Sequence, residues 1–202
     1  MGRAKMGDER REQILTAFEK CVVRDGLAKT TLQNVAAEAG LPRSLVRYFT
    51  GNRDDMVDLL IERMIERGQA QLEAMQPKGR QAKTEDLLGF LFGGVFADET
   101  SNCIVTELFY LSGHDESIKA RLQKMYQGMQ DVLSKQMAKD GIGKGPAERR
   151  ALSYALMSLA YGDATFSFLG LKGGARNSLR SHAALLLEEA ARKGRAQGRK
   201  QK

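Results

Sequence analysis

The 202-residue sequence contains no tryptophan, only three prolines and only two cysteines. Proline ends helices and runs of β-branched residues favour strands, and this sequence has little of either. Ala, Leu, Glu, Lys, Arg, Gln and Met are plentiful instead, and these residues form helices readily. The composition therefore predicts an all-α protein, and its 42% of apolar residues argues against global disorder.

The two cysteines, Cys21 and Cys103, are too few and too far apart for a disulfide framework or a zinc site. The longest apolar run, residues 87–97, is too short to cross a bilayer. Residues 1–12 lack the apolar centre of a secretory signal. We therefore expect a cytoplasmic protein with no metal, no cofactor and no membrane segment.

The formal net charge is +7, which favours polyanionic partners. Much of this excess lies near the C-terminus, where residues 191–202 carry six basic side chains and no acidic one. We interpret residues 194–202 as a disordered, solvated tail. An alternative is that the tail adds non-specific attraction to phosphate.

Apolar spacing and stop signals predict about nine helices. The first runs from Asp8 to Asp25, and Thr31 caps a second that ends at Ala39. Pro42 opens a third helix, which ends at Phe49, and Asn52 caps a fourth. The fourth covers residues 53–76, and the remaining helices are expected at residues 84–95, 101–111, 115–138, 147–169 and 177–192.

Residues 32–49 have the layout of a helix-turn-helix unit. Ala36 is small where the second helix of the pair must cross closely, and Gly40 suits the turn. The remaining constraint is an apolar core between the helices, which is met by Val35, Leu41, Val46 and Phe49. Taken alone, the same residues also fit an ordinary helical hairpin. A preceding amphipathic helix and a following acid-capped helix favour DNA binding.

In such a unit the second helix enters the major groove, and its early exposed residues meet base edges. Those residues are Pro42, Arg43, Ser44, Arg47 and Tyr48. Arginine pairs bidentately with guanine, whereas tyrosine meets a phosphate or a thymine methyl group. Thr31 begins a helix whose backbone N–H groups suit a phosphate, and Arg53 suits a second phosphate contact.

The stretch "TTLQNVAAEAGLPRSLVRYFTGNRDDMV" resembles the DNA-binding signature of the TetR family of bacterial transcriptional repressors. The specific resemblance covers about residues 12–60. It implies three DNA-binding helices, a connecting fourth helix and a helical body that dimerises and binds ligand. It also implies a homodimer on a palindromic operator that is released by a small-molecule effector. We accordingly expect a DNA-binding domain at residues 8–52 and a ligand-binding and dimerisation domain at residues 53–193.

The sequence departs from the family pattern at the end of the recognition helix. Without gaps, Arg47 replaces an aromatic residue that commonly touches phosphate, and Thr50 replaces the usual phenylalanine. We expect Phe49 to supply the packing that Thr50 lacks. The additional arginine suggests a stronger preference for guanine or phosphate.

A ligand-responsive body needs a cavity, and aromatic and methionine side chains suit an adaptable apolar pocket. Plain core packing is the alternative for each candidate. Asp163 interrupts an apolar face and is a candidate contact with ligand or partner, while His114 is interpreted as part of a helix joint. The candidate pocket residues are Phe92, Phe96, Cys103, Phe109, Tyr110, Met125, Tyr126, Met129, Tyr161, Asp163, Thr165 and Phe166.

The last two expected helices, at about residues 147–169 and 177–192, carry apolar stripes and are the expected homodimer interface. An enzyme is disfavoured, because the sequence has no phosphate-binding glycine loop, nucleophile elbow, HExxH or CxxC. An activator, or an architectural DNA-binding protein without a ligand, stays open as an alternative. The predicted partners are a double-stranded DNA operator and an effector of unknown identity.

Overall fold

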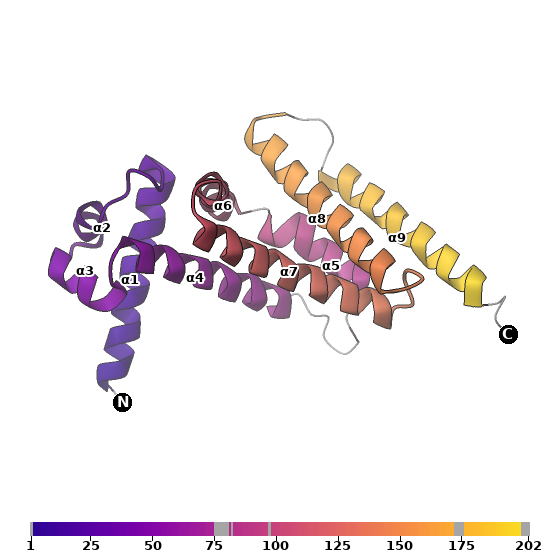
Figure 1. Ribbon diagram of the computed structural model, residues 1–202, viewed down its shortest axis with the longest axis horizontal. Coiled ribbons are helices and arrows are strands. Elements are labelled where there is room, and N and C mark those ends of the chain that lie inside the picture. Colours follow the sequence, from indigo (N-terminus) through magenta and orange to yellow (C-terminus); the bar gives the residue numbers. More distant parts are fainter. Residues whose placement is uncertain (1, 75–80, 82, 97, 172–175, 199–202) are drawn as a thin grey trace. The chain divides into compact units, whose positions relative to one another are not determined.

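A computed structural model describes residues 2–74, 81, 83–96, 98–171 and 176–198. Every regular element in these residues is helical, which confirms the all-α prediction (Figure 1). Nine α-helices and one π-helical turn occur in the described part of the chain. They are α1 (Gly2–Asp25), α2 (Leu32–Ala39), α3 (Arg43–Thr50), α4 (Arg53–Ala74), α5 (Thr84–Phe90), the π-turn η1 (Leu91–Val95), α6 (Glu99–Ser112), α7 (Glu116–Lys139), α8 (Pro146–Phe168) and α9 (Arg176–Gly198).

The chain forms two compact units. The first contains residues 1–67 and 103–122, and the second contains residues 68–102 and 123–202. Helices α4, α6 and α7 each contribute residues to both units. Packing therefore groups most of α6 and the start of α7 with the N-terminal helices, although the predicted boundary follows residue 52. The functional division into residues 8–52 and 53–193 stays a prediction, because packing does not assign function.

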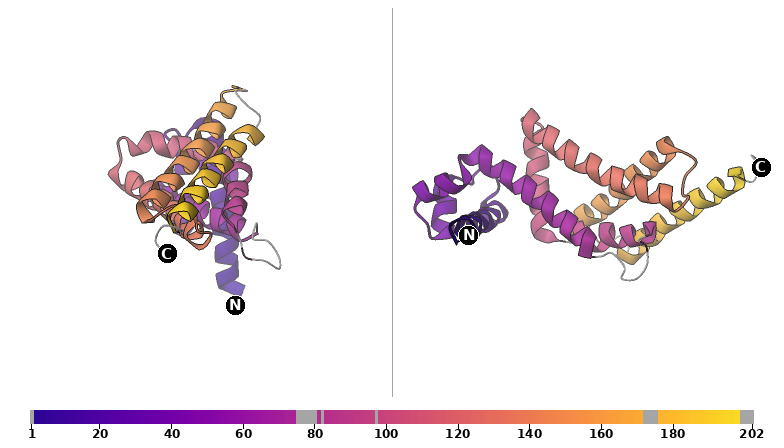
Figure 2. Two further views of the ribbon diagram at one scale, coloured as in Figure 1. Left: turned by 90° about the vertical axis from the view of Figure 1, so that its right-hand side faces the viewer. Right: turned by 90° about the horizontal axis from the view of Figure 1, so that it is seen from below.

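Helices α1, α2 and α3 form a three-helix head within the first unit (Figures 1 and 2). Each helix turns an apolar stripe inward, and the first turns of α4 add to the same unit. The burial of these stripes from water is the main favourable term in forming the head. Its fully buried side chains include Ile14, Phe18, Val22, Leu27, Val35, Val46, Met56 and Leu60.

Most helix limits lie within two residues of the prediction, and the start of α1 and the end of α9 differ more. Helix α1 begins at Gly2 rather than Asp8, because residues 3–6 include good helix formers and no stop signal. Helix α9 reaches Gly198, six residues beyond its predicted end at residue 192, whereas the predicted disorder of the tail stays a prediction. Residues 199–202, and most of residues 77–83 between the expected fourth and fifth helices, lie outside the described residues.

The second unit is built on one apolar cluster, to which α5, η1, α7, α8 and α9 contribute. Helices α8 and α9 lie side by side in Figures 1 and 2. The π-turn η1 widens the helix across Gly93 and Gly94, so the helix predicted at residues 84–95 is α-helical only as far as Phe90. No described helix combines the length and the apolar character that a membrane span requires.

Candidate nucleic-acid interface

The N-terminus of α2 is capped by a reciprocal pair of side-chain hydrogen bonds. The Thr31 hydroxyl accepts a hydrogen bond from the Asn34 backbone N–H at 3.2 Å, and the Asn34 side chain accepts one from the Thr31 N–H at 3.0 Å. Thr31 is exposed. This reciprocal cap confirms the predicted helix start and fixes the first turn of α2, whose backbone N–H groups suit an anion.

Gly40 makes the turn between α2 and α3. Its φ of 64° and ψ of 32° lie in the left-handed region, and its N–H caps α2 on the carbonyl groups of Ala36 and Ala37. Pro42 follows in an extended conformation as the N-cap residue of α3. The helix therefore starts at Arg43, one residue later than predicted. The helix-turn-helix layout inferred from the sequence is present in the structure.

Helix α3 has one buried side and one polar side. Val46 faces the core at 0% exposure, whereas Leu41 and Phe49 are half-buried rather than fully buried as expected. Tyr48 is 79% exposed. Its ring stands edge-on to Phe49, with centroids 5.1 Å apart. The predicted base-reading residues all lie exposed on this segment, namely Pro42, Arg43, Ser44, Arg47 and Tyr48.

Arg43 and Arg47 are one helical turn apart and therefore lie on the same side of α3. Neither guanidinium makes a hydrogen bond or an ion pair with any described residue. Other arginines of the first unit are engaged, as Arg24 is with Asp25 and Glu38. The two cations of α3 are thus free to meet an external anion or a base edge.

Thr50 is buried at 3% exposure, and its hydroxyl donates to the Val46 carbonyl at 2.8 Å. The expectation that Phe49 would replace its packing is wrong, because Thr50 itself fills the buried position while Phe49 is half-buried. The Arg11 side chain donates to the Phe49 carbonyl at 3.3 Å. The end of α3 is therefore held by contacts to α1 and its own last turn.

Arg53 is engaged inside the protein. Its guanidinium donates to the Leu27 carbonyl at 2.7 Å and to the Thr30 carbonyl at 3.2 Å. These carbonyls belong to the turn of residues 26–31, hereafter the α1–α2 turn. A phosphate contact by Arg53 stays a prediction and would use the remaining N–H groups. The Asn52 cap is confirmed, since its side chain accepts from the N–H groups of Asp54 and Asp55.

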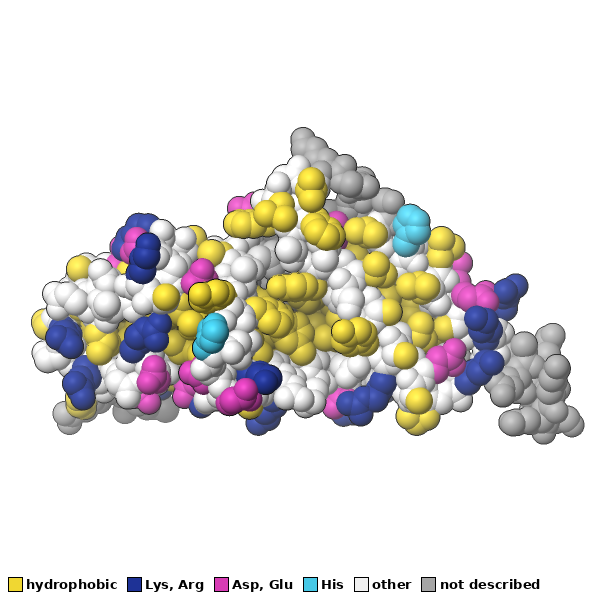
Figure 3. Space-filling view, turned by 45° about the horizontal axis from the view of Figure 1, so that its top comes forward, with side chains coloured by type: hydrophobic (Ala, Val, Ile, Leu, Met, Phe, Trp, Pro, Cys, Tyr) yellow, Lys and Arg dark blue, Asp and Glu magenta, His cyan; other side chains and the backbone are white. Residues whose placement is uncertain are grey.

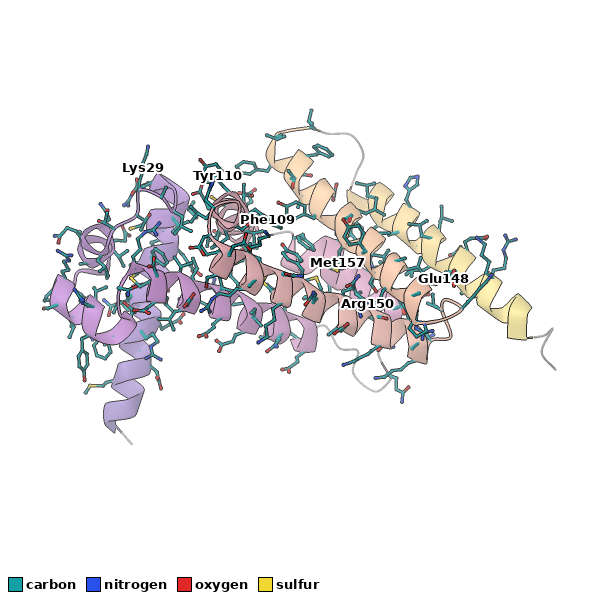
Figure 4. All side chains as sticks on the ribbon, viewed as in Figure 1. Lys29, Phe109, Tyr110, Glu148, Arg150 and Met157 are labelled. Atoms are coloured by element: carbon teal, nitrogen blue, oxygen red, sulfur yellow. The ribbon has the colours of Figure 1, made fainter. Side chains whose placement is uncertain are left out.

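The structure adds two residues that the sequence did not single out. Lys29 is exposed on the α1–α2 turn and points away from the helices (Figure 4). Glu107 of α6 accepts a hydrogen bond from the Leu27 backbone N–H at 2.7 Å. Lys29 had a local signal, because it lies two residues before the Thr31 cap. Glu107 had none, because its partner is 80 residues away in the chain.

The candidate pocket residues do not form one group. Phe92 and Phe96 lie in the apolar cluster of the second unit, and Tyr126, Met129 and Tyr161 pack against it. The rings of Phe96 and Tyr161 meet edge-on at 6.0 Å. Burial raises the pKa of the Tyr126 hydroxyl. These five side chains remain the best candidates for a pocket wall, with core packing as the alternative.

The other candidates fit a pocket wall less well. Phe109 and Tyr110 are 41% and 69% exposed, and they lie with Cys103 in the first unit (Figure 4). Met125 is half-buried, whereas Thr165 and Phe166 are exposed. Asp163 is half-buried, so it avoids the full penalty of a buried acid. His114 lies in the turn between α6 and α7, as interpreted.

No protein-family model matches this sequence, and no curated protein matches it. Solved structures do match. A TetR transcription regulator from Haloarcula marismortui aligns with a TM-score of 0.77 and 16% identity, over 91% of this chain and 98% of that one. A TetR-family regulator from Rhodococcus sp. aligns with a TM-score of 0.70 and 18% identity, over 91% and 99%.

A third structure is described as a transcriptional regulator from Saccharomonospora viridis in complex with choline. It aligns with a TM-score of 0.73 and 16% identity, over 90% of this chain and 96% of that one. All three structures are described as transcriptional regulators. Identities this low establish the fold alone. The chain has the fold of TetR-family transcriptional regulators, as the resemblance of residues 12–60 predicted.

Proposed function

We propose that this protein is a DNA-binding transcriptional regulator that inserts α3 into the major groove. The observation that carries the proposal is the pair Arg43 and Arg47, exposed on one side of α3 and without a partner in the described residues. Four residues of helix span about 6 Å, which is close to two base-pair steps of about 3.4 Å each. Two guanidinium groups at this spacing suit guanines or a guanine and a phosphate.

Other residues of the three-helix head also support insertion of α3 into the major groove. The capped N-terminus of α2 offers backbone N–H groups to a phosphate, and Thr31 is exposed beside them. On α3, Ser44 directly follows Arg43 and Tyr48 directly follows Arg47. These two side chains therefore widen the contact surface beside the arginines. Phosphate contacts of this kind set the position of the reading helix, and the arginines supply the base preference.

A homodimer on a palindromic operator is the second part of the proposal. One small head buries little surface on DNA, and two-fold symmetry doubles the contacts. Apolar side chains gather on the face of α8 and α9 (Figure 3). A second copy would cover them, as in a four-helix bundle. The exposed apolar residues of these helices and of the segment that follows α8 are Tyr154, Phe166, Phe168, Leu169, Leu171, Leu185 and Leu186.

A small-molecule effector that releases the operator is the third part. The support is the choline complex of the Saccharomonospora viridis structure and the presence of Phe92, Phe96, Tyr126 and Tyr161 in or against the apolar cluster of the second unit. An effector acts only if it binds the DNA-released state more tightly than the DNA-bound state. We propose repression in the cytoplasm as the biological role. An activator, or an architectural protein without an effector, would use the same face of α3.

The test begins with selection of duplexes by the full-length protein from a random-sequence pool. We expect a palindromic consensus, to which Arg43→Ala and Arg47→Ala each bind about ten- to a hundredfold more weakly. Each contact to a phosphate also contributes about 0.9 to the slope of log affinity against log salt, so its loss lowers that slope by about one. Arg150→Ala is the control for net charge, because it removes an exposed arginine of α8 that lies 3.8 Å from Asp131.

Two results would reject the proposal. One is the absence of any enriched sequence after selection with folded protein. The other is an affinity loss in Arg150→Ala equal to that of the α3 variants, since net charge rather than α3 would then explain binding.

A further inference from the structure

The first turns of α1 lie against the C-terminal end of α3 (Figures 1 and 2). The Arg11 side chain donates through Nε to the Phe49 carbonyl at 3.3 Å. A Cβ added to Gly7 would lie 3.9 Å from the Phe49 ring, so α1 and this ring are within van der Waals reach of each other. Arg11 and Phe49 are 38 residues apart in the chain, yet they belong to one surface of the three-helix head.

Arg11 keeps donors for an external anion in addition to this bond. Its side chain is exposed, and its Nη1 and Nη2 groups make no hydrogen bond or ion pair with a described residue. A guanidinium carries N–H donors on each of its nitrogens, and the contact with Phe49 uses the one on Nε. The remaining donors of Arg11, and its full positive charge, therefore lie at the point where α1 meets α3.

This charge offsets a local repulsion between α3 and DNA. The last carbonyl groups of a helix have no partner within it, and they give its C-terminus a negative charge of about half an electron. Phe49 is the last residue but one of α3, so its carbonyl belongs to this group. Arg11 places a cation directly on this carbonyl. With Arg47 in the same turn, the negative end of α3 becomes a surface that attracts phosphate.

The dimensions of α3 bring this end close to the DNA backbone. Its eight residues span about 12 Å, and the major groove is about 12 Å wide. The early residues of a recognition helix meet base edges, so its later residues lie toward the phosphates that border the groove. Tyr48, which directly precedes Phe49, is 79% exposed at this end. A phosphate at the border of the groove is therefore within reach of a side chain as long as Arg11.

We propose that Arg11 of α1 binds a phosphate at the border of the major groove while its Nε holds the end of α3. This inference rests on the proposed function, since it adds a residue to the same DNA-binding site. The ligand is a phosphodiester group and not a base edge, so the contact sets the position of α3 and carries no sequence preference of its own.

The first experiment separates the charge of Arg11 from its bond to Phe49. Affinity for the selected operator is measured over a range of salt concentrations with wild type, Arg11→Gln, Arg11→Met and Arg11→Lys, each shown to be folded by circular dichroism. Glutamine keeps an N–H donor without the charge, methionine keeps only the length, and lysine keeps the charge. We expect about tenfold weaker binding by the two uncharged variants. Their salt slope should fall by about 0.9 for each protomer bound, whereas Arg11→Lys should keep the wild-type slope.

Lys20→Ala is the control for net charge. It removes the same formal charge from α1, at a side chain that is 66% exposed and lies 3.7 Å from Glu38. We expect its affinity and salt slope to stay close to those of wild type. An equal loss in Lys20→Ala and Arg11→Gln would overturn the inference, because net charge rather than a phosphate contact would then explain the effect.

The second experiment locates the phosphate. Single operator phosphates are replaced by uncharged methylphosphonates, and each modified duplex is bound by wild type and by Arg11→Gln. We expect one position in each half-site where the neutral linkage weakens wild type about tenfold and leaves Arg11→Gln almost unchanged, because the two changes remove the same contact. A purely structural role of Arg11 would instead weaken binding equally at every position and leave the salt slope intact, and that result would overturn the inference.

The two proposals fail in different ways. A selected operator to which Arg11→Gln binds with wild-type affinity and salt slope would overturn this inference and leave the proposed function standing. Failure of the folded wild-type protein to select any sequence would reject both the proposed function and this inference.

Discussion

Arg67 of α4 binds the carboxylate of Glu19 of α1 through two hydrogen bonds, of 2.7 and 3.1 Å. Glu19 is 5% exposed, and a second arginine, Arg63, lies 3.3 Å from the same carboxylate. Arg63 is itself buried and also donates to Glu12 at 2.6 Å. A single buried acid thus joins two arginines of α4 to the first helix of the head.

Replacement of Glu19 by alanine should strongly destabilise the protein. It leaves the buried Arg63 without its inner partner, and breaking a buried pair on one side costs about 3–5 kcal/mol. Arg67→Ala should cost less, because its side chain is 41% exposed and water can replace the lost contact. Urea unfolding followed by circular dichroism checks both, and similar losses in the two variants would contradict this account.

Thr50 offers a test of the family pattern. An aromatic residue is usual at this position, but here the site is filled by a buried threonine whose hydroxyl bonds to Val46. Thr50→Phe should destabilise by about 1–3 kcal/mol through overpacking. Thr50→Val keeps the shape and loses one hydrogen bond, at a cost of about 1 kcal/mol. Thermal unfolding compares them, and a more stable Thr50→Phe would show that the site has unused space.

The two glycines that flank α3 should tolerate alanine differently. Gly40 has φ 64°, and an added Cβ would meet nothing within 4 Å, so Gly40→Ala should cost about 1–2 kcal/mol. Gly51 has φ 76° and ψ −148°, and its Cβ would lie on the Asp55 side chain. Asp55 would have to release the Asn52 N–H that it caps at 2.8 Å.

Gly51→Ala should therefore cost more, about 2–4 kcal/mol from backbone strain and the lost cap together. Chemical denaturation of both variants, with wild type alongside, measures the difference. If the two alanine variants are equally stable, the clash with Asp55 does not lower the free energy of unfolding.

Local chemistry explains which parts of this site could be predicted from sequence. The Thr31 cap, the Gly40 turn and the exposed arginines of α3 depend on residues within four positions of one another, and each was predicted. The contacts of Arg53 and Glu107 span 23 to 80 residues, and no periodic or cap signal reports them. For this reason only a phosphate contact was predicted for Arg53. The start of α1 was predicted six residues too late, although residues 3–6 include good helix formers and no stop signal.

Arg53→Lys separates the two roles of that side chain. Lysine retains the charge for a phosphate but cannot span the Leu27 and Thr30 carbonyls as a fork. We expect about 2 kcal/mol lower stability and an unchanged salt slope of operator binding. Arg10→Lys, on the exposed surface of α1, is the control. Unchanged stability in Arg53→Lys would show that the internal bonds contribute little and would favour the phosphate role.

The face formed by α8 and α9 predicts the oligomeric state. Leu185 is 59% exposed on α9, and burial of such a side chain against a second copy contributes about 1.5–3 kcal/mol. Leu185→Glu would place two buried charges at the symmetric interface, so sedimentation velocity should show a monomer where the wild type is a dimer. Val132→Glu makes a similar change at a 41% exposed aliphatic residue of α7 and should leave the dimer intact.

The monomeric variant should also bind a palindromic operator no more tightly than a single half-site, because affinity from two linked heads is lost. A dimer that survives Leu185→Glu and dissociates with Val132→Glu would move the interface to α7.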